Sequence, residues 1–170
     1  MDMDMSTVSL LVAAVALAVA LVALFRKSAP APPAAVPAHN SQLLPLQLQA
    51  YERLVILCER ISLPALISRT AAADLSAQEM RYVLIENIKQ EFDYNASQQI
   101  YVSAAAWDAV RSLRDQNMLV INQVSNVLAP TARASELNKQ LLEVLIGQEG
   151  KALHSAALET LNDEAKRIMR

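Results

Sequence analysis

An uncharged apolar run from Val8 to Phe25 constrains this chain more than any other feature, because Ser9 is its only polar residue. At about 1.5 Å per residue, a helix over this run and its flanks spans roughly 30 Å, the thickness of the hydrocarbon core of a bilayer. A helix also satisfies its own backbone hydrogen bonds, as the membrane interior requires. The sequence therefore predicts a transmembrane helix over residues 8–25.

A cleaved signal peptide is the main alternative for this segment. Signal peptides begin with basic residues and have a shorter apolar core of about 7–15 residues. Here the start is acidic, with Asp2 and Asp4, and the basic pair Arg26-Lys27 follows the run directly. We therefore favour a retained anchor. Because basic flanks stay in the cytoplasm, we expect residues 1–7 to form a short extracytoplasmic tail at the inner membrane and the C-terminal domain to be cytoplasmic.

Within the run, Ala16 and Ala20 lie four residues apart. Small residues at this spacing let two transmembrane helices approach closely, so the pair is a candidate packing face. The alternative is that alanine is simply common in this run.

Residues 26–42 follow as a basic flank and a Pro/Ala-rich linker, with Pro30, Pro32, Pro33 and Pro37 among alanines. Proline favours the extended polyproline II conformation, which rises about 3.1 Å per residue. We interpret the segment as a spacer; a ligand for a proline-binding module is the alternative.

Residues 43–170 predict a small all-α bundle of about five helices. Glycine is scarce, at two residues in the chain, and alanine and leucine are abundant, a composition that favours helices. Apolar residues recur at helical spacing in segments that we expect to start at about Leu46, Ser76, Ser103, Ser135 and Gly150.

Several residues indicate where these helices begin and end. Ser76 and Glu79 fit a capping box, and Ser103 can cap the next helix. We expect Leu63 to Thr70 to form a turn or a brief helix, Ile100 to Val102 an extended link, and Gly147 a left-handed helix cap.

Composition and residue spacing argue against nucleic-acid binding, metal binding and catalysis. The net charge is −2, whereas a nucleic-acid-binding domain normally shows a basic excess, so we expect no nucleic-acid partner. Neither histidine has a companion at metal-ligand spacing, and we expect His154 on the surface. Cys58 lies among apolar residues and is interpreted as a buried small hydrophobe, with a reactive thiol as the alternative. We expect no cofactor, no metal and no enzymatic activity.

One polar and aromatic stretch offers a candidate interaction surface, formed by Tyr94, Gln98, Gln99, Tyr101 and Trp107. Tyrosine and tryptophan supply large amphipathic contact areas and often anchor interfaces. The alternative is that Tyr101 and Trp107 fill the core where two helices meet.

This stretch, together with Tyr51-Glu52-Arg53-Leu54 and Glu59-Arg60-Ile61, resembles an uncharacterised Bacteroidota family of single-pass, membrane-anchored, all-helical proteins. The resemblance implies an anchor followed by a helical domain and transfers no functional residue.

The sequence thus predicts a membrane-tethered helical interaction or scaffold module. Its expected partners are the lipid bilayer and one or more proteins, self-association included. One alternative is a small structural subunit of a larger membrane complex, assembled through its transmembrane helix. A second is a cryptic ligand- or metal-binding bundle that uses carboxylates such as Glu52 and Glu59, although the interleaved Arg53 and Arg60 favour a salt-bridged surface.

Overall fold

The computed structural model describes Leu17 and residues 39–70, 72, 74–146 and 149–170. Residues 39–170 form one compact unit that, where described, contains six α-helices, one 3-10 helix and no strand. The all-α expectation is confirmed. The predicted tail, the anchor with Ala16 and Ala20, the linker up to residue 38 and the Gly147 cap lie outside the described residues, apart from Leu17. None of the described helices combines the length and the apolar character needed to cross a bilayer.

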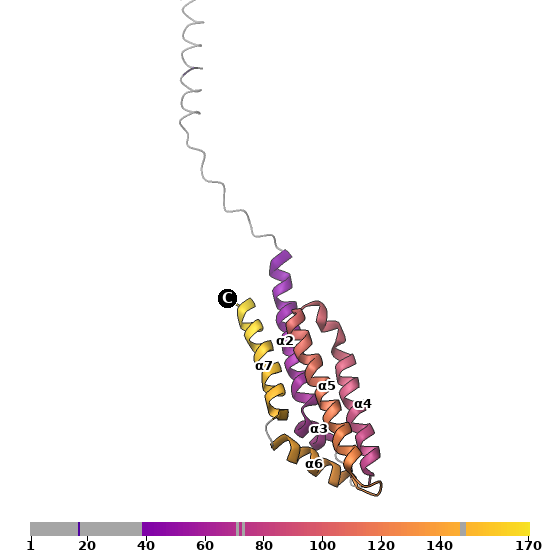
Figure 1. Cartoon of the computed structure of the whole chain (residues 1–170). Helices are drawn as coiled ribbons and strands as arrows, with labels where there is room; N and C mark the ends of the chain where they lie inside the picture. The colour runs from indigo at the N-terminus through magenta and orange to yellow at the C-terminus, as the bar shows by residue number, and fades with distance from the viewer. Residues whose placement is uncertain (1–16, 18–38, 71, 73, 147–148) are drawn as a thin grey trace, which may run out of the picture. The chain divides into compact units, whose positions relative to one another are not determined.

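Four long helices run alternately in opposite directions along the bundle (Figure 1): α2 (His39–Ile61), α4 (Ala77–Asn95), α5 (Ala104–Val127) and α7 (Glu149–Ile168). Two shorter helices, α3 (Leu63–Thr70) and α6 (Ala134–Ile146), lie at the end where α2 finishes. The N-terminus of α2, the α4–α5 connection and the C-terminus of α7 share the opposite end (Figure 1). Helix α2 packs against α4, α5 and α7.

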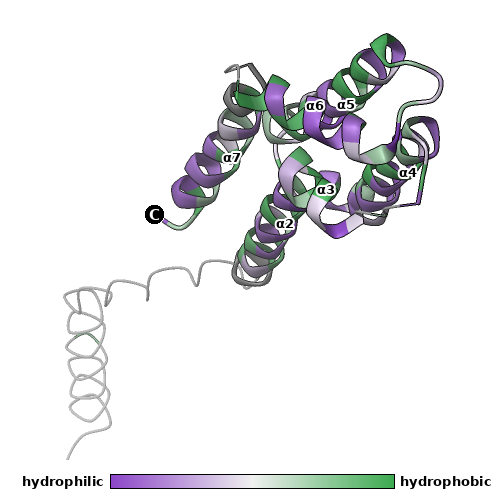
Figure 2. Cartoon of the chain, turned by 90° about the horizontal axis from the view of Figure 1, so that it is seen from below, coloured by the Kyte–Doolittle hydropathy of each residue, from purple (hydrophilic) through white to green (hydrophobic). Residues whose placement is uncertain are grey.

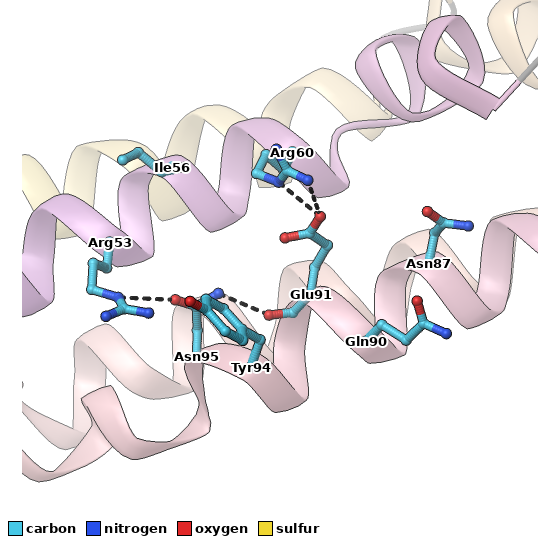
Figure 3. A pocket seen from close by; sticks show the side chains of 8 residues that line it. All are labelled: Arg53, Ile56, Arg60, Asn87, Gln90, Glu91, Tyr94 and Asn95. Atoms are coloured by element: carbon cyan, nitrogen blue, oxygen red, sulfur yellow. Dashed lines mark hydrogen bonds and ion pairs between the residues drawn. The ribbon is translucent and has the colours of Figure 1, made fainter.

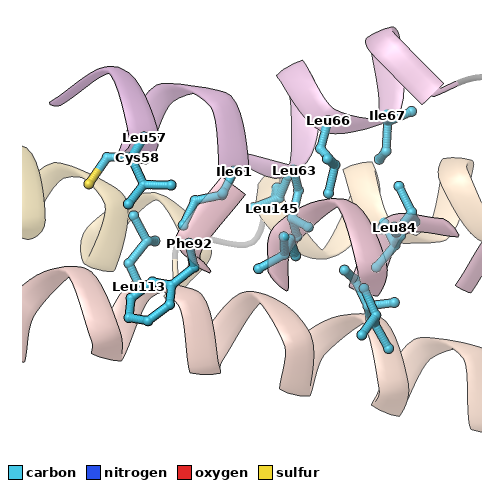
Figure 4. Packing of buried hydrophobic residues seen from close by; sticks show 14 of the residues in the cluster. Leu57, Cys58, Ile61, Leu63, Leu66, Ile67, Leu84, Phe92, Leu113 and Leu145 are labelled. Carbon is cyan, nitrogen blue, oxygen red and sulfur yellow. The ribbon is translucent and has the colours of Figure 1, made fainter. Parts of the chain in front are cut away.

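The core fills the space between these helices. Each helix turns a hydrophobic stripe toward its neighbours and a hydrophilic face outward (Figure 2). Figure 4 shows side chains from α2, α3, α4, α5 and α6 meeting in one cluster. Cys58 is fully buried in it, which confirms the interpretation from sequence. The largest fully buried side chains include Leu54, Leu57, Ile61, Met80, Leu84, Ile88, Leu113, Ile121, Leu137 and Leu141.

The predicted caps are present. The Ser76 hydroxyl accepts a hydrogen bond from the Glu79 amide (3.2 Å), and the Glu79 carboxylate accepts one from the Ser76 amide (2.9 Å), so the capping box is confirmed. Ser103 caps α5 by accepting from the Ala106 amide (3.0 Å). The start of α4 is also tied to that of α6, because the Ala77 amide donates to the Ala132 carbonyl (2.9 Å).

The first predicted helix start was wrong: α2 begins at His39 rather than near Leu46, so the helix extends into residues 39–42 of the predicted linker and Pro45 lies inside it. A proline within a helix removes the one hydrogen bond that its amide would donate four residues back. Leu43, Leu44 and Leu46 are exposed here, so water has access to this turn and can replace that bond.

The extended link at Ile100 to Val102 was also wrong. A 3-10 helix, η1 (Ala96–Ile100), continues directly from α4, and Tyr101 keeps a near-helical backbone (φ −106°, ψ −6°). The Tyr101 amide donates to the Gln98 carbonyl (3.0 Å). A tight turn is needed because α4 and α5 run in opposite directions, and β-branched residues do not prevent it.

Of the two forms expected for Leu63–Thr70, a turn or a brief helix, the helix is present. The described bundle therefore has six α-helices rather than about five. Pro64 lies in the first turn of α3, where the missing amide donor costs no helical bond. At the break between α2 and α3, the Asn117 side-chain amide from α5 donates to the Ile61 carbonyl (2.8 Å). This buried bond satisfies an acceptor left free at the end of α2.

Candidate interaction groove between α2 and α4

The five residues of the predicted interaction surface do not share one face. Tyr94, in the last turn of α4, is 75% exposed, and Gln99 is also exposed, whereas Gln98 is buried. Trp107 is half-buried, with its ring centroid 5.0 Å from that of Phe92, and it packs against the core. Tyr101 is half-buried and lines a different groove, formed with α7. Of the five, only Tyr94 lies at the groove described next.

A groove of about 500 Å³ runs between α2 and α4 (Figure 3). Its α2 side carries residues three and four positions apart, a spacing that places them on one helix face. Ile56, which is 50% exposed, lies between the two arginines of that face. The lining residues are Arg53, Ile56 and Arg60 from α2, and Asn87, Gln90, Glu91, Tyr94 and Asn95 from α4.

An ion pair links α2 to α4 within the groove. Arg60 donates through Nε to Glu91 Oε1 (2.7 Å) and through a terminal nitrogen to the same oxygen. This hydrogen bonding and the charge of Glu91 raise the pKa of Arg60 above its ordinary value. Arg69 of α3 also lies 3.7 Å from this carboxylate oxygen. The Glu91 carboxylate is therefore paired with two arginines of the bundle itself.

Arg53 is held differently. Its Nε donates to Asn95 Oδ1 (3.4 Å), and Asn95 is fixed in turn because its amide donates to the Glu91 carbonyl (2.8 Å). The guanidinium carbon lies 5.3 Å from the centroid of the Tyr94 ring, within the range of a cation–π contact. Among the described residues, Arg53 forms no ion pair. A guanidinium group of this kind can pair with a carboxylate through two parallel N–H donors.

No sequence pattern joins Arg53 and Arg60 with Tyr94, because these residues lie on different helices. The available signal was local: Arg53, Ile56 and Arg60 recur at helical spacing beside the apolar stripe of α2. Their pairing with α4 depends on how the helices pack.

His154, which was expected on the surface, is half-buried. Its side chain is 25% exposed, with Nε2 covered and 3.7 Å from a carboxylate oxygen of Glu59. It lines a cavity of about 270 Å³ with Leu113, Asn117 and Leu145, because α7 folds back beside α2 and α5. Glu52 and Glu59 are exposed. The described residues contain no group of three or more His, Cys, Asp or Glu side chains placed to hold a metal ion.

Comparison with known families covers nearly the whole chain, with a match over residues 2–168. The chain belongs to DUF7935, a family of unknown function. This confirms the resemblance to an uncharacterised family. No curated protein and no solved structure matches this DUF7935 member significantly.

Proposed function

We propose that this DUF7935 member is a non-enzymatic, membrane-tethered interaction module whose α2–α4 groove binds a protein segment that carries a carboxylate. One observation carries the choice of surface: exposed Tyr94 and the guanidinium of Arg53 lie together on the groove, with Arg53 free of any ion pair among the described residues. Tyrosine and arginine are the residue types over-represented at energetic hot spots of interfaces.

The chemistry of the groove supports an acidic partner. Arg53, Arg60 and Arg69 carry positive charge around it, and Glu91 is its only lining acid among the described residues. Because Asn95 already holds Arg53 in place, a bound carboxylate would not have to order that side chain, and preorganisation of this kind favours binding. Ile56 and the Tyr94 ring supply apolar area for an adjoining side chain of the partner.

The tether rests on the sequence. The uncharged run over residues 8–25 and the Pro/Ala-rich segment after it support an anchor in the inner membrane with the bundle in the cytoplasm. The resemblance to a membrane-anchored Bacteroidota family, drawn from the sequence alone, would imply the same arrangement.

The anchor is tested by alkaline carbonate extraction of membranes that contain the full chain. We expect the chain to stay in the pellet, and Val15→Arg to move it to the supernatant, because a charge at the centre of the bilayer costs several kcal/mol. A conservative Val15→Leu control should stay in the pellet. Release of the unaltered chain by carbonate would contradict the anchor.

The groove is tested by proximity labelling in native cells with the full chain tagged at its C-terminus. We expect a reproducible cytoplasmic or membrane protein that is lost with Tyr94→Ala and with Arg53→Ala. Tyr82→Ala is the matched control, since Tyr82 is also on α4 and 64% exposed but does not line the groove. Equal enrichment in Tyr94→Ala and Tyr82→Ala would reject the groove, and labelling confined to extracytoplasmic proteins would reject the topology.

A further inference from the structure

Exposed apolar side chains gather at one end of the bundle. They come from three elements that Figure 1 places together: the first turns of α2, the tip of η1 and the end of α7. A shallow groove of about 490 Å³ joins these elements, since Gln47, Ile100 and Arg167 all line it. The exposed residues are Leu43 (42%), Leu44 (36%), Leu46 (45%), Ile100 (74%) and Met169 (58%).

The same end carries a cluster of positive charge. Lys166 and Arg167 occupy the last turn of α7, and Arg170 follows it; all three are exposed. Within the described part of the chain, none of them forms an ion pair. Glu164 lies on the preceding turn but is held inward, because Tyr51 and Ser103 donate hydrogen bonds to its two carboxylate oxygens (2.7 and 2.8 Å). These three cations are therefore available to bind a negatively charged surface.

The position of the α2 N-terminus, which follows the linker and the apolar run, points to a bilayer as that negatively charged surface. Helix α2 begins at His39, at this end, and the residues just before it are the linker that follows the apolar run. Fully extended, residues 26–38 reach roughly 45 Å at most. If the apolar run is inserted in a bilayer, this end is where the bundle is attached to it. Exposed leucines beside lysine and arginine are the combination that binds an anionic lipid surface.

We propose that this end of the bundle docks on the bilayer, with its apolar side chains at the interface and Lys166, Arg167 and Arg170 on anionic headgroups. The proposal rests on the membrane anchor proposed above and adds an orientation to it. Docking leaves the α2–α4 groove on the side of the bundle, open to a partner.

The test uses the full chain in vesicles, with a fluorophore attached to single introduced cysteines and a nitroxide quencher on the lipid headgroups. Buried Cys58 can remain in place. The positions are Leu46→Cys, Ile100→Cys and Met169→Cys, and the control is Thr131→Cys, which is exposed in the α5–α6 connection at the opposite end. With anionic lipid, we expect strong quenching at the first three positions and little at the control. Equal quenching at both ends would overturn the proposal.

Charge is tested by combining Lys166→Gln, Arg167→Gln and Arg170→Gln. Each cation near an anionic surface contributes a factor of about five, so the equilibrium constant for docking should fall by about 100-fold and quenching at the three positions should fall toward the control value. Arg133→Gln with Lys139→Gln, exposed cations at the other end, should leave the quenching unchanged. Quenching that ignores the triple substitution, or that is as strong in neutral vesicles, would overturn the proposal.

Carbonate extraction of the same vesicles separates this proposal from the anchor. A chain that resists extraction but is quenched equally at both ends retains the anchor and loses the docked orientation. A chain that carbonate removes, but whose three labels are quenched before extraction only in anionic vesicles, loses the anchor and retains a lipid-binding end.

Discussion

At the scale of single residues, Cys58 is a buried probe of the folded state. Burial, the larger cause, and the nearby charge of Glu59 raise the pKa of its thiol to about 12. At pH 8 the thiolate fraction is therefore roughly a thousandfold below that of an ordinary cysteine. We expect a thiol reagent to modify the native chain at least about 100-fold more slowly than the urea-unfolded chain. Ser155→Cys, at an exposed position, should react rapidly and is the control.

The same pKa predicts a loss of stability at alkaline pH. Because the pKa in the folded state is raised, the contribution of the thiol is complete below the unfolded pKa, near 9, and is lost as pH rises toward 12. Urea denaturation of Cys58→Ala should show a smaller loss between pH 8 and pH 11 than that of the unaltered chain. Fast native labelling at pH 8, or identical pH profiles, would contradict the buried thiol.

Asn117 predicts a second effect at the scale of a residue. The hydrogen bond from its side-chain amide to the Ile61 carbonyl is buried. Asn117→Ala therefore leaves that carbonyl without a hydrogen-bond donor at the break between α2 and α3. Such a group costs about 1–3 kcal/mol. We expect the urea midpoint to fall accordingly. Asn122, a half-buried asparagine that accepts a hydrogen bond from Arg81, is the control, and Asn122→Ala should lower the urea midpoint less. Equal losses for the two variants would show that the hydrogen bond to Ile61 contributes no more than the one to Arg81.

At the scale of elements, the capping box joins the start of α4 to the rest of the fold. Ser76→Ala should destabilise the chain by about 1 kcal/mol and Ser76→Gly by only a few tenths, because glycine is itself tolerated at this position. Urea denaturation at pH 7 measures the difference. An alanine variant as stable as the glycine variant would show that the tertiary pairing with α6 holds this terminus without the cap.

The capping box also has a pH dependence with a defined sign. Hydrogen bonds from the Ser76 amide and hydroxyl lower the pKa of Glu79. Its contribution is then present above the ordinary glutamate pKa, about 4.3, and is lost as pH falls through the lowered value. The difference between Ser76→Ala and the unaltered chain should therefore be full at pH 7 and shrink only in acid.

The helices also show which features could be predicted from the sequence and which could not. The caps at Ser76 and Ser103 and the start of α6 near Ser135 depend on neighbouring residues, and these predictions were correct to within a residue. The start of α2 was predicted too late, because a helix tolerates the single hydrogen bond missing at Pro45 where water has access. Ile100 to Val102 misled because their strand propensity is weaker than the requirement for a tight turn. The half-buried position of His154 and the pairing of Arg53 with Tyr94 depend on which helices become neighbours, which no local pattern encodes.

At the scale of the whole molecule, the bundle is not uniformly secured. Among the side chains from Leu153 to Ile168 in α7, only Ala157 and Leu161 are buried, whereas α4 and α5 each bury a full stripe. Regions with few buried apolar contacts open at a lower free energy than the core. The hydrogen bonds of Glu164 with Tyr51 and Ser103 therefore add to the attachment of α7, whose hydrophobic packing contributes less than that of α4 and α5.

This arrangement predicts an order of opening. In native-state hydrogen exchange, the amides of α7 should exchange before those of α4 and α5. Glu164→Gln removes the charge that strengthens both bonds, each of which is worth about 1.5–3 kcal/mol when one partner is ionised. Exchange in α7 should then accelerate by at least about tenfold, while α4 keeps its rate. Glu159→Gln, at an exposed acid on the same helix, is the control. If Glu164→Gln accelerated α4 and α7 equally, α7 would belong to the global unfolding unit, and the bundle would open as a whole rather than from its last helix.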